Sequence, residues 1–294
     1  MQTKSVLLVD AFADEPLGGV PIAVVPDATR EQLRRVAGEL GTGGAVTLED
    51  DRLVSIVPDE AAEIEAVVAG CVGLLEYDLL DVGGQTSIAV DSDGHERERS
   101  ADVDADRRVH VELPEREVEE ATVPLDRLTP ALNIDSSAIE DVTADLPVGR
   151  VGGFGGTLIV PVAFLANLLD SSPDRETLAA LLAETETSRA CAFTFDTLGR
   201  RTDLHVRTFD PTASDCERPA SGVAVAACGR YLEYYGAFDD ETERLRVESG
   251  HVLDRPGTVV TTLGPAPRVG GTALTALDGT ITVPEEPDDD IIEL

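Results

Sequence analysis

With 294 residues, the chain is long enough for two domains of typical size, each with its own core. It has 57 acidic and 23 basic residues, a formal net charge of -34, and Lys4 is its single lysine. This composition offers no basic face for phosphate groups, so we expect no nucleic-acid partner. It also contains no run of about 18 apolar residues, so we expect no membrane span.

The acidic residues are spread along the chain, with higher local density only at 115–120 and 285–293. A dispersed, lysine-poor acidic surface is typical of proteins that work in concentrated salt, where the Debye length falls to about 3 Å and like charges are screened. We therefore expect a halophilic protein. The N-terminus lacks the charged start and the cleavage site of a signal peptide, so we expect a cytoplasmic location.

The first half of the chain predicts six elements. In chain order they are strands at 5–10 and 21–25, a helix at 30–40, strands at 46–48 and 53–57, and a helix at 64–80. Apolar residues recur at helical spacing in the first helix, as at Leu33, Val36 and Leu40. The second helix is apolar nearly all round, which predicts a buried helix.

The second half predicts the same order of elements. They are a strand at 158–162, a helix opened by 172–175, strands at 190–195 and 204–209, and a helix at 219–235. Between the halves, residues 114–147 are acidic and interrupted by prolines, with a possible short helix at Leu125, Leu128 and Leu132. Residues 285–294 indicate a solvated acidic tail.

A ten-residue segment at 68–77 returns at 225–234, with six of the ten positions identical. Together with the repeated order of elements, this predicts two related halves rather than a longer repeat array. Two packed halves leave a cleft in which a small ligand can bind.

The four cysteines show no CxxC spacing and the four histidines no HxxH or HExxH spacing, so the sequence gives no support for a metal site. Cys71 and Cys228 occupy matching positions in the repeated helices. We interpret this pair as small buried hydrophobic residues.

Several short motifs then point to one family. They are Val9-Asp10-Ala11-Phe12, Pro16-Leu17-Gly18-Gly19, Leu158-Ile159-Val160-Pro161-Val162, Arg207-Thr208-Phe209-Asp210-Pro211, Arg255-Pro256 and Val269-Gly270-Gly271-Thr272-Ala273. In order and spacing they resemble the PhzF-like family, named for phenazine biosynthesis, which shares the diaminopimelate-epimerase fold. The resemblance covers about residues 9–283.

The resemblance implies an α+β protein with two pseudo-symmetric domains of diaminopimelate-epimerase type, each a curved, mainly antiparallel sheet around a central buried helix. We expect one domain at 1–116, joined by a returning strand at about 278–284, and a second at 117–277. Active family members move protons on small carboxylate-bearing substrates in the cleft between the domains, without a cofactor. Family members self-associate, so a homodimer is also expected.

The acid–base positions of the family are replaced in this chain. An ungapped alignment from residues 37–40 puts Gly44 at the family's glutamate, and the motif at 217–224 puts Arg218 at its aspartate. The family's histidine position holds Val67, or Cys71 with a different gap. Glycine and valine cannot carry a proton and arginine stays protonated, so we expect the usual isomerisation to be lost.

The start of the second buried helix keeps features that suit an anion. Ser221 and Gly222 offer backbone N–H groups, and Arg218 adds a positive charge. These three residues are therefore candidate ligand-binding residues. The alternative interpretation is an ordinary helix cap beside a surface arginine. Chemistry by a thiolate of Cys216 or Cys71 would require a lowered pKa.

Two functional hypotheses follow. In the first, the chain is a PhzF-like isomerase or epimerase family protein that binds a small anionic metabolite in its cleft. In the second, it is a non-catalytic descendant that acts as a scaffold or partner subunit. An open cavity that Gly44, Val67 and Arg218 face, with other titratable groups near, favours the first hypothesis. A cavity filled by side chains favours the second.

Overall fold

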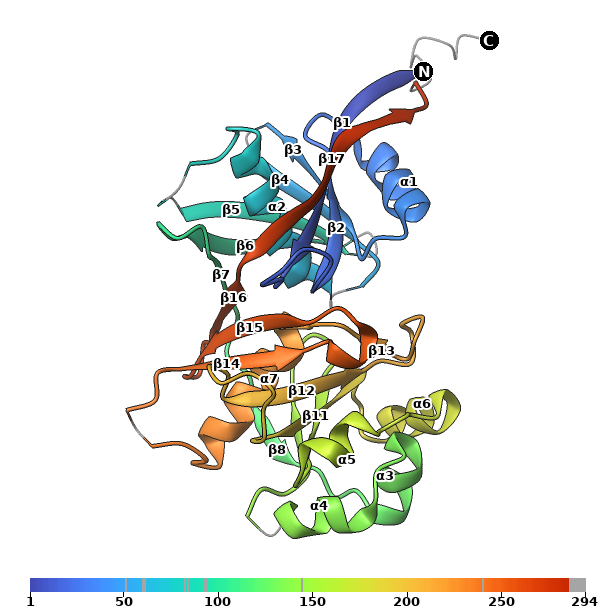
Figure 1. Cartoon of the computed structure of the whole chain (residues 1–294), viewed down its shortest axis with the longest axis vertical. Coiled ribbons are helices and arrows are strands. Elements are labelled where there is room, and N and C mark those ends of the chain that lie inside the picture. Colours follow the sequence, from blue (N-terminus) through green and yellow to red (C-terminus); the bar gives the residue numbers. More distant parts are fainter. Residues whose placement is uncertain are drawn as a thin grey trace.

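A computed structural model describes residues 1–50, 52–59, 62–81, 83, 85–92, 95–143, 145–239 and 241–285. The chain folds into two lobes stacked along the long axis of the molecule (Figure 1). Except for Glu285, the acidic tail predicted at 285–294 lies outside the described residues. Among the described residues, no helix is long and apolar enough to cross a membrane.

The N-terminal lobe is a mixed sheet in which most neighbouring strands are antiparallel. In sheet order its strands are β17 (Ala273–Val283), β1 (Gln2–Ala11), β2 (Val20–Val24), β3 (Ala45–Glu49), β4 (Arg52–Val57), β5 (Gln85–Ser92), β6 (His95–Val103) and β7 (Val109–Glu112). Only the pairs β2–β3 and β4–β5 are parallel among these strands. Helix α1 (Arg30–Leu40) follows β2, and helix α2 (Glu63–Glu76) follows β4.

The C-terminal lobe is built in the same way. In sheet order its strands are β8 (Val118–Glu120), β9 (Gly149–Val151), β10 (Thr157–Pro161), β11 (Arg189–Thr194), β12 (Leu204–Phe209), β14 (Arg244–Ser249), β15 (Gly257–Thr262) and β16 (Arg268–Gly271), and β13 (Glu217–Arg218) pairs with β12. Its helices are α3 (Leu125–Leu132), α4 (Ser136–Thr143), α5 (Leu165–Leu169), α6 (Arg175–Glu184) and α7 (Gly222–Tyr234), with a single 3-10 turn at His251–Leu253.

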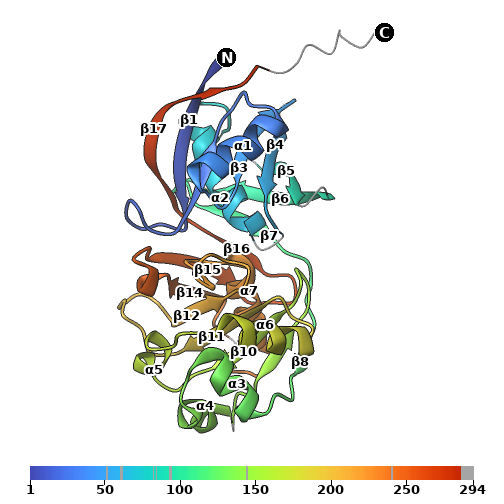
Figure 2. The same ribbon diagram turned by 90° about the vertical axis from the view of Figure 1, so that its right-hand side faces the viewer.

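The two lobes share one pairing pattern. Along β1 to β7, the successive pairs are antiparallel, parallel, antiparallel, parallel, antiparallel and antiparallel. The pairs from β9 through β12 and β14 to β16 follow the same sequence. This correspondence confirms the two related halves predicted from the repeat. Strands β7 and β16 pair antiparallel and join the lobes, as Figure 2 shows from the side.

The two copies of the repeated segment fall largely within α2 and α7, which are the central buried helices of the lobes. Nearly every residue of both helices is buried, because both are apolar on all faces. Their N-terminal ends touch each other. A Cβ atom placed on Gly222 would lie 2.7 Å from Cγ2 of Ile64, so this approach requires a glycine.

Helices α3 to α6 pack over the outer face of the C-terminal sheet and enclose a second apolar core. In the N-terminal lobe, α1 covers β2 and β3, and a capping box between Thr29 and Gln32 fixes its start. The helix at 30–40 and the strand at 204–209 have the predicted bounds.

Other predicted bounds differ from those in the structure for local reasons. Helix α2 ends at Glu76 rather than residue 80, since Asp78 takes a left-handed conformation with φ of 55°. Helix α7 begins at Gly222 rather than at Pro219, because Ser221 is extended and caps the helix. The returning strand β17 is longer than the segment at 278–284. It pairs with the whole of β1, from Ala273 to Val283.

Candidate functional site

A cavity of about 830 Å³ lies where residues of both lobes meet, and we call it the interlobe cavity. The N-terminal lobe contributes the start of β2, the loop after α1, residues 58–59 and the start of α2 to its lining. The C-terminal lobe contributes the loop 154–155, the start of β11, the segment 210–220 and the turn 253–255. The N-terminal end of α2 opens onto it, and the residues just before α7 line it. The backbone N–H groups at such helix ends carry partial positive charge.

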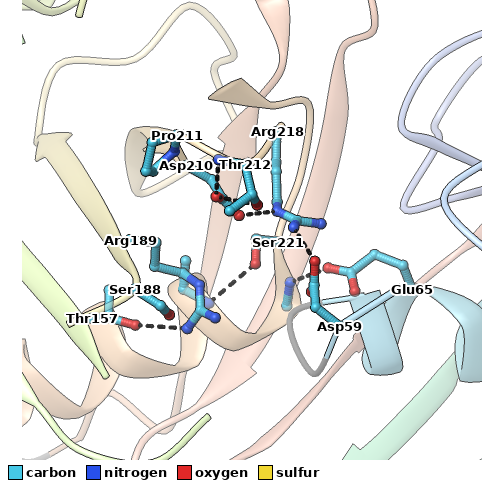
Figure 3. A network of polar contacts seen from close by, with 12 residues as sticks. Asp59, Glu65, Thr157, Ser188, Arg189, Asp210, Pro211, Thr212, Arg218 and Ser221 are labelled. Carbon is cyan, nitrogen blue, oxygen red and sulfur yellow. Dashed lines mark hydrogen bonds and ion pairs between the residues drawn. The ribbon is translucent and has the colours of Figure 1, made fainter. Parts of the chain in front are cut away.

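Arg218 bridges the two lobes across this cavity (Figure 3). Its Nη2 lies 2.6 Å from Oδ2 of Asp59, and its Nε lies 2.7 Å from Oδ2 of Asp210. The other oxygen of Asp210 accepts hydrogen bonds from the backbone N–H and the hydroxyl of Thr212, at 2.8 and 2.6 Å. Burial acts to raise the pKa of Asp210, but the charge of Arg218 and these hydrogen bonds hold it below its ordinary value.

Glu65 reaches from the first turn of α2 to the start of α7. Its Oε1 accepts a hydrogen bond from the backbone N–H of Gly222 at 2.8 Å. Its Oε2 is buried and has no hydrogen-bond partner among the described residues. The residue is 2% exposed, and burial raises the pKa of its carboxyl to about 7, against the lowering effect of Gly222 and Arg218. Glu65 can therefore hold or release a proton near neutral pH.

Arg189, at the start of β11, is a buried cation that lines the same cavity and is 3% exposed. Its Nη1 donates only long hydrogen bonds, to Gly156 O at 3.5 Å and to the hydroxyl of Thr157 at 3.4 Å, and its Nε has no partner among the described residues. Burial and the neighbouring charge of Arg218 lower its pKa. No carboxylate of the described chain forms an ion pair with this guanidinium.

Two further arginines lie close to the cavity wall. Phe154 lines the cavity from a glycine-rich loop, and the guanidinium groups of Arg99 and Arg116 lie 5.0 and 4.6 Å from its ring centroid. Arg99 is paired with the buried Glu63. Burial, with Arg189 and Arg99 nearby, lowers the pKa of Arg116 to about 10, so it stays charged at neutral pH. The lining of the cavity thus combines three arginines, Arg189, Arg218 and Arg255, with five carboxylates, and Arg99 and Arg116 contact its wall through Phe154.

The other carboxylates that line the cavity have partners or are exposed. Glu217 forms two hydrogen bonds with the guanidinium of Arg207, at 2.9 and 2.6 Å, and both side chains are buried. Asp215 is exposed, and the Ser214 hydroxyl lies 3.2 Å from it. Glu65 therefore differs from its neighbours, because one of its oxygens is both buried and unpartnered.

The three residues predicted at the family's acid–base positions are not brought together. Arg218 lines the cavity, but Gly44 does not, and a Cβ on Gly44 would lie 2.9 Å from the carbonyl oxygen of Ile56. Val67 is fully buried in the core on α2. Cys71, the alternative position, is also fully buried, and burial raises its pKa to about 12. Burial also raises the pKa of Cys216, which is opposite to the change that thiolate chemistry requires.

The predicted ligand-binding residues lie close together, but partners within the protein already occupy their groups. The Ser221 hydroxyl accepts a hydrogen bond from Ala224 N–H as the N-cap of α7. Gly222 N–H is taken by Glu65, and Arg218 is held by two aspartates. The carboxylate cradle predicted at this helix start is thus filled by a side chain of the other lobe.

Sequence reasoning missed Glu65 and Arg189. The internal repeat held a signal for Glu65: its offset of 157 residues aligns Glu65 with Gly222, the residue whose N–H it contacts. No comparable signal marks Arg189, since its lack of an acidic partner depends on the folded neighbourhood.

A second cavity of about 410 Å³ lies beside the 3-10 turn, between residues 14–15 and the loop 198–202.

Within the described part of the chain, no group of three or more His, Cys, Asp or Glu residues is arranged to hold a metal ion.

Comparison with known proteins identifies the fold. The family model for phenazine biosynthesis-like proteins, PhzC-PhzF, matches residues 66–279. The uncharacterized isomerase YfhB of Bacillus subtilis is 27% identical over 274 residues, which cover 88% of this chain and 90% of that protein. A crystal structure of a PhzF-family phenazine biosynthesis protein from Bacillus anthracis is similar with a TM-score of 0.78, at 20% identity, over 96% of this chain and 100% of that one.

A probable proline racemase from Agrobacterium radiobacter is similar in fold, with a TM-score of 0.60 at 15% identity over 98% of this chain and 95% of that one. These similarities confirm the α+β fold with two lobes that the sequence predicted. Because the family model covers well over half of the chain, the protein belongs to the PhzC-PhzF family of phenazine biosynthesis-like proteins.

Proposed function

We propose that this family member binds a small carboxylate-bearing metabolite in the interlobe cavity and acts there as a cofactor-independent isomerase. The family and the distant relation to an uncharacterized isomerase supply the reaction class. The side chains that line the cavity indicate the chemical class of the ligand, a carboxylate.

The observation that carries the proposal is the buried guanidinium of Arg189, which donates only two long hydrogen bonds and forms no ion pair with a carboxylate of the described residues. A buried charge without a partner is costly, and proteins nearly always pair such groups or leave them for a ligand. A guanidinium fork matches the geometry of a carboxylate and can donate two parallel hydrogen bonds to it. A carboxylate bound at Arg189 would supply the missing partner inside a cavity large enough for a small metabolite.

The scaffold hypothesis gains less support from the same residues. A protein that had kept only a structural role would have no need of an open cavity with buried, partnerless polar atoms. The cavity measures about 830 Å³, and it is lined by Glu65 and Arg189, each of which has a buried polar atom without a partner among the described residues.

A binding screen tests the proposal. Thermal shift in molar salt is measured with proline, diaminopimelate and α-ketobutyrate, each compared with its amide. We expect at least one acid, and not its amide, to raise the melting temperature, because only the acid offers a charge to Arg189. Arg189→Met should abolish that shift. Arg127→Met, which removes an exposed arginine on α3 of the same lobe, is the matched control and should keep it.

The possible results of the binding screen lead to different conclusions. If amides stabilise the protein as well as acids do, the ligand class is wrong. If Arg189→Met keeps the shift while Arg127→Met also keeps it, Arg189 is not the carboxylate receptor. If no acid stabilises the wild type, the proposed function is refuted.

A further inference from the structure

We propose that Glu65 is the acid–base residue of the interlobe cavity, and that it moves a proton on one face of the bound molecule. The inference rests on the proposed function, because it requires a ligand in this cavity. It goes beyond that function by naming the reacting group and by restricting the stereochemistry.

The geometry singles out Glu65 by the state of its two oxygens. Oε1 is fixed by Gly222 N–H at 2.8 Å, so the carboxyl cannot rotate freely. Oε2 is left without a partner among the described residues, in a side chain that lines the cavity. A carboxyl held at one oxygen, with the other buried and without a hydrogen-bond partner among the described residues, can give or take a proton at that second oxygen. A purely structural cap would need only the first contact.

The other buried or half-buried carboxylates of the cavity lack this freedom. Asp59 and Asp210 are bound by Arg218, and Glu217 is bound by Arg207. Asp215 lies exposed at the rim. Among the described lining residues there is no histidine, cysteine or tyrosine. Among the described lining residues the site therefore offers one buried proton-exchanging group, Glu65, while Asp215 is exposed to solvent.

The proton balance of the step is simple. Ionised Glu65 takes the proton from a carbon next to the carboxylate of the ligand. The electron pair of the broken C–H bond stays on that carbon and spreads into the carboxylate, whose charge Arg189 balances. Protonated Glu65 then returns the proton to the same carbon, or to a carbon conjugated with it, on the same face. Glu65 ends ionised, as it began, and no other reactant is consumed.

The electrostatic surroundings suit this role. The charged groups that act on Glu65 are Asp59 just before α2, Arg218 on β13 and Arg189 on β11. Burial raises the pKa of Glu65 to about 7, the range in which a carboxyl both releases and accepts protons in neutral solution. The sequence-based expectation that the usual isomerisation is lost rested on Gly44, Val67 and Arg218, and it did not consider Glu65.

A stereochemical restriction follows from the single base. Inversion at carbon requires one group to remove the proton and another to deliver a proton from the opposite face. With Glu65 alone, the ligand exchanges its proton with solvent while the configuration is retained, or the double bond moves along the chain on one face. The protein is thus predicted to isomerise by proton shift rather than to epimerise.

The first test needs no ligand. Infrared spectra recorded across a pH titration in molar salt are compared between the wild type and Glu65→Gln. We expect the difference to contain the C=O band of one carboxylic acid, which disappears with a midpoint near pH 7. Glu76→Gln, the same substitution at the other end of α2, is the control and should leave that band in place. If no such band separates the wild type from Glu65→Gln, the inference is refuted whatever the ligand.

The second test uses each acid that stabilises the wild type in the binding screen. In D2O we expect deuterium to enter the carbon next to the carboxylate of proline or diaminopimelate, and we expect proline to keep its configuration. α-Ketobutyrate serves only in the binding screen, because the carbon next to its carboxylate bears no hydrogen. Glu65→Gln should still bind the acid but should lose deuterium incorporation by about 10²–10⁴-fold. Glu76→Gln should exchange at the wild-type rate.

These outcomes distinguish the inference from the proposed function. Binding that depends on Arg189, without any deuterium incorporation, refutes the role of Glu65 and leaves the binding proposal standing. Equal loss of binding in Glu65→Gln and Arg189→Met makes Glu65 a binding group and also refutes its role. Inversion as fast as exchange refutes the single-base restriction.

Discussion

Glu65→Gln should change how the stability of the protein depends on pH, because the carboxyl is buried without a compensating cation in contact. In the folded chain its pKa is raised from the ordinary 4.5 to about 7. Below about pH 4.5 the carboxyl is neutral in both states, and its favourable contribution is fully present. As pH rises through about 7, the folded state must hold an ionised, buried group, and that contribution is lost.

The size of the effect follows from the interval between the two pKa values. One pKa unit corresponds to about 1.4 kcal/mol, so the interval from 4.5 to about 7 corresponds to about 3 kcal/mol in the free energy of unfolding. Glutamine stays neutral and can still accept from Gly222 N–H. We therefore expect Glu65→Gln to match the wild type near pH 4.5 and to be more stable by about 3 kcal/mol above about pH 8.

Urea unfolding in molar salt, repeated across this pH range, measures the difference directly. Comparing the two proteins at each pH removes the contribution of all other titrating groups, and Glu76→Gln controls for the loss of one acidic residue from α2. A free-energy difference that stays constant from about pH 5 to about pH 8 would refute the buried, ionisable state of Glu65.

Four further changes can be measured by the same unfolding assay. Arg207→Met leaves Glu217 buried without its partner and should cost about 3–5 kcal/mol; a loss below about 1 kcal/mol would contradict the pair. Ser221→Ala removes the N-cap of α7 and should cost about 1 kcal/mol, whereas no loss would mean that the cap is redundant. Gly222→Ala places a methyl group 2.7 Å from Ile64 and should cost about 1–3 kcal/mol; a more stable variant would contradict the close helix contact. Removing salt from the wild type should lower the unfolding midpoint, because a net charge of -34 is then unscreened. An unchanged midpoint would contradict halophilic adaptation. Halophilic adaptation and the expected homodimer both stay predictions.

The elements that the sequence predicted well are those with a strong local pattern. The apolar spacing at Leu33, Val36 and Leu40 placed α1, and the all-round apolar runs placed α2 and α7 as buried helices. The repeat at 68–77 and 225–234 predicted the duplicated lobes, which the matching strand pairings confirm. Strands such as β8 and β9 were missed, since three residues carry too little periodicity to be recognised.

The candidate site was less accessible to sequence reasoning. The motif alignment directed attention to Gly44, Val67 and Arg218, and only Arg218 lines the cavity. The groups with unusual states, Glu65 and Arg189, stand in no motif that the alignment matched. Their state is defined by what lies next to them in the folded chain.

By itself, the sequence determined the family, the α+β class and the doubling of the fold, because apolar periodicity and repeated motifs are properties of short segments. Only the tertiary structure decided which polar groups are left without partners. Glu65 meets Gly222 across 157 residues of chain, and Arg189 is buried in a neighbourhood where Arg218 has taken both nearby aspartates. Proton affinity and unpaired charge arise from burial and from contacts between lobes, so they exist only once the two lobes have come together.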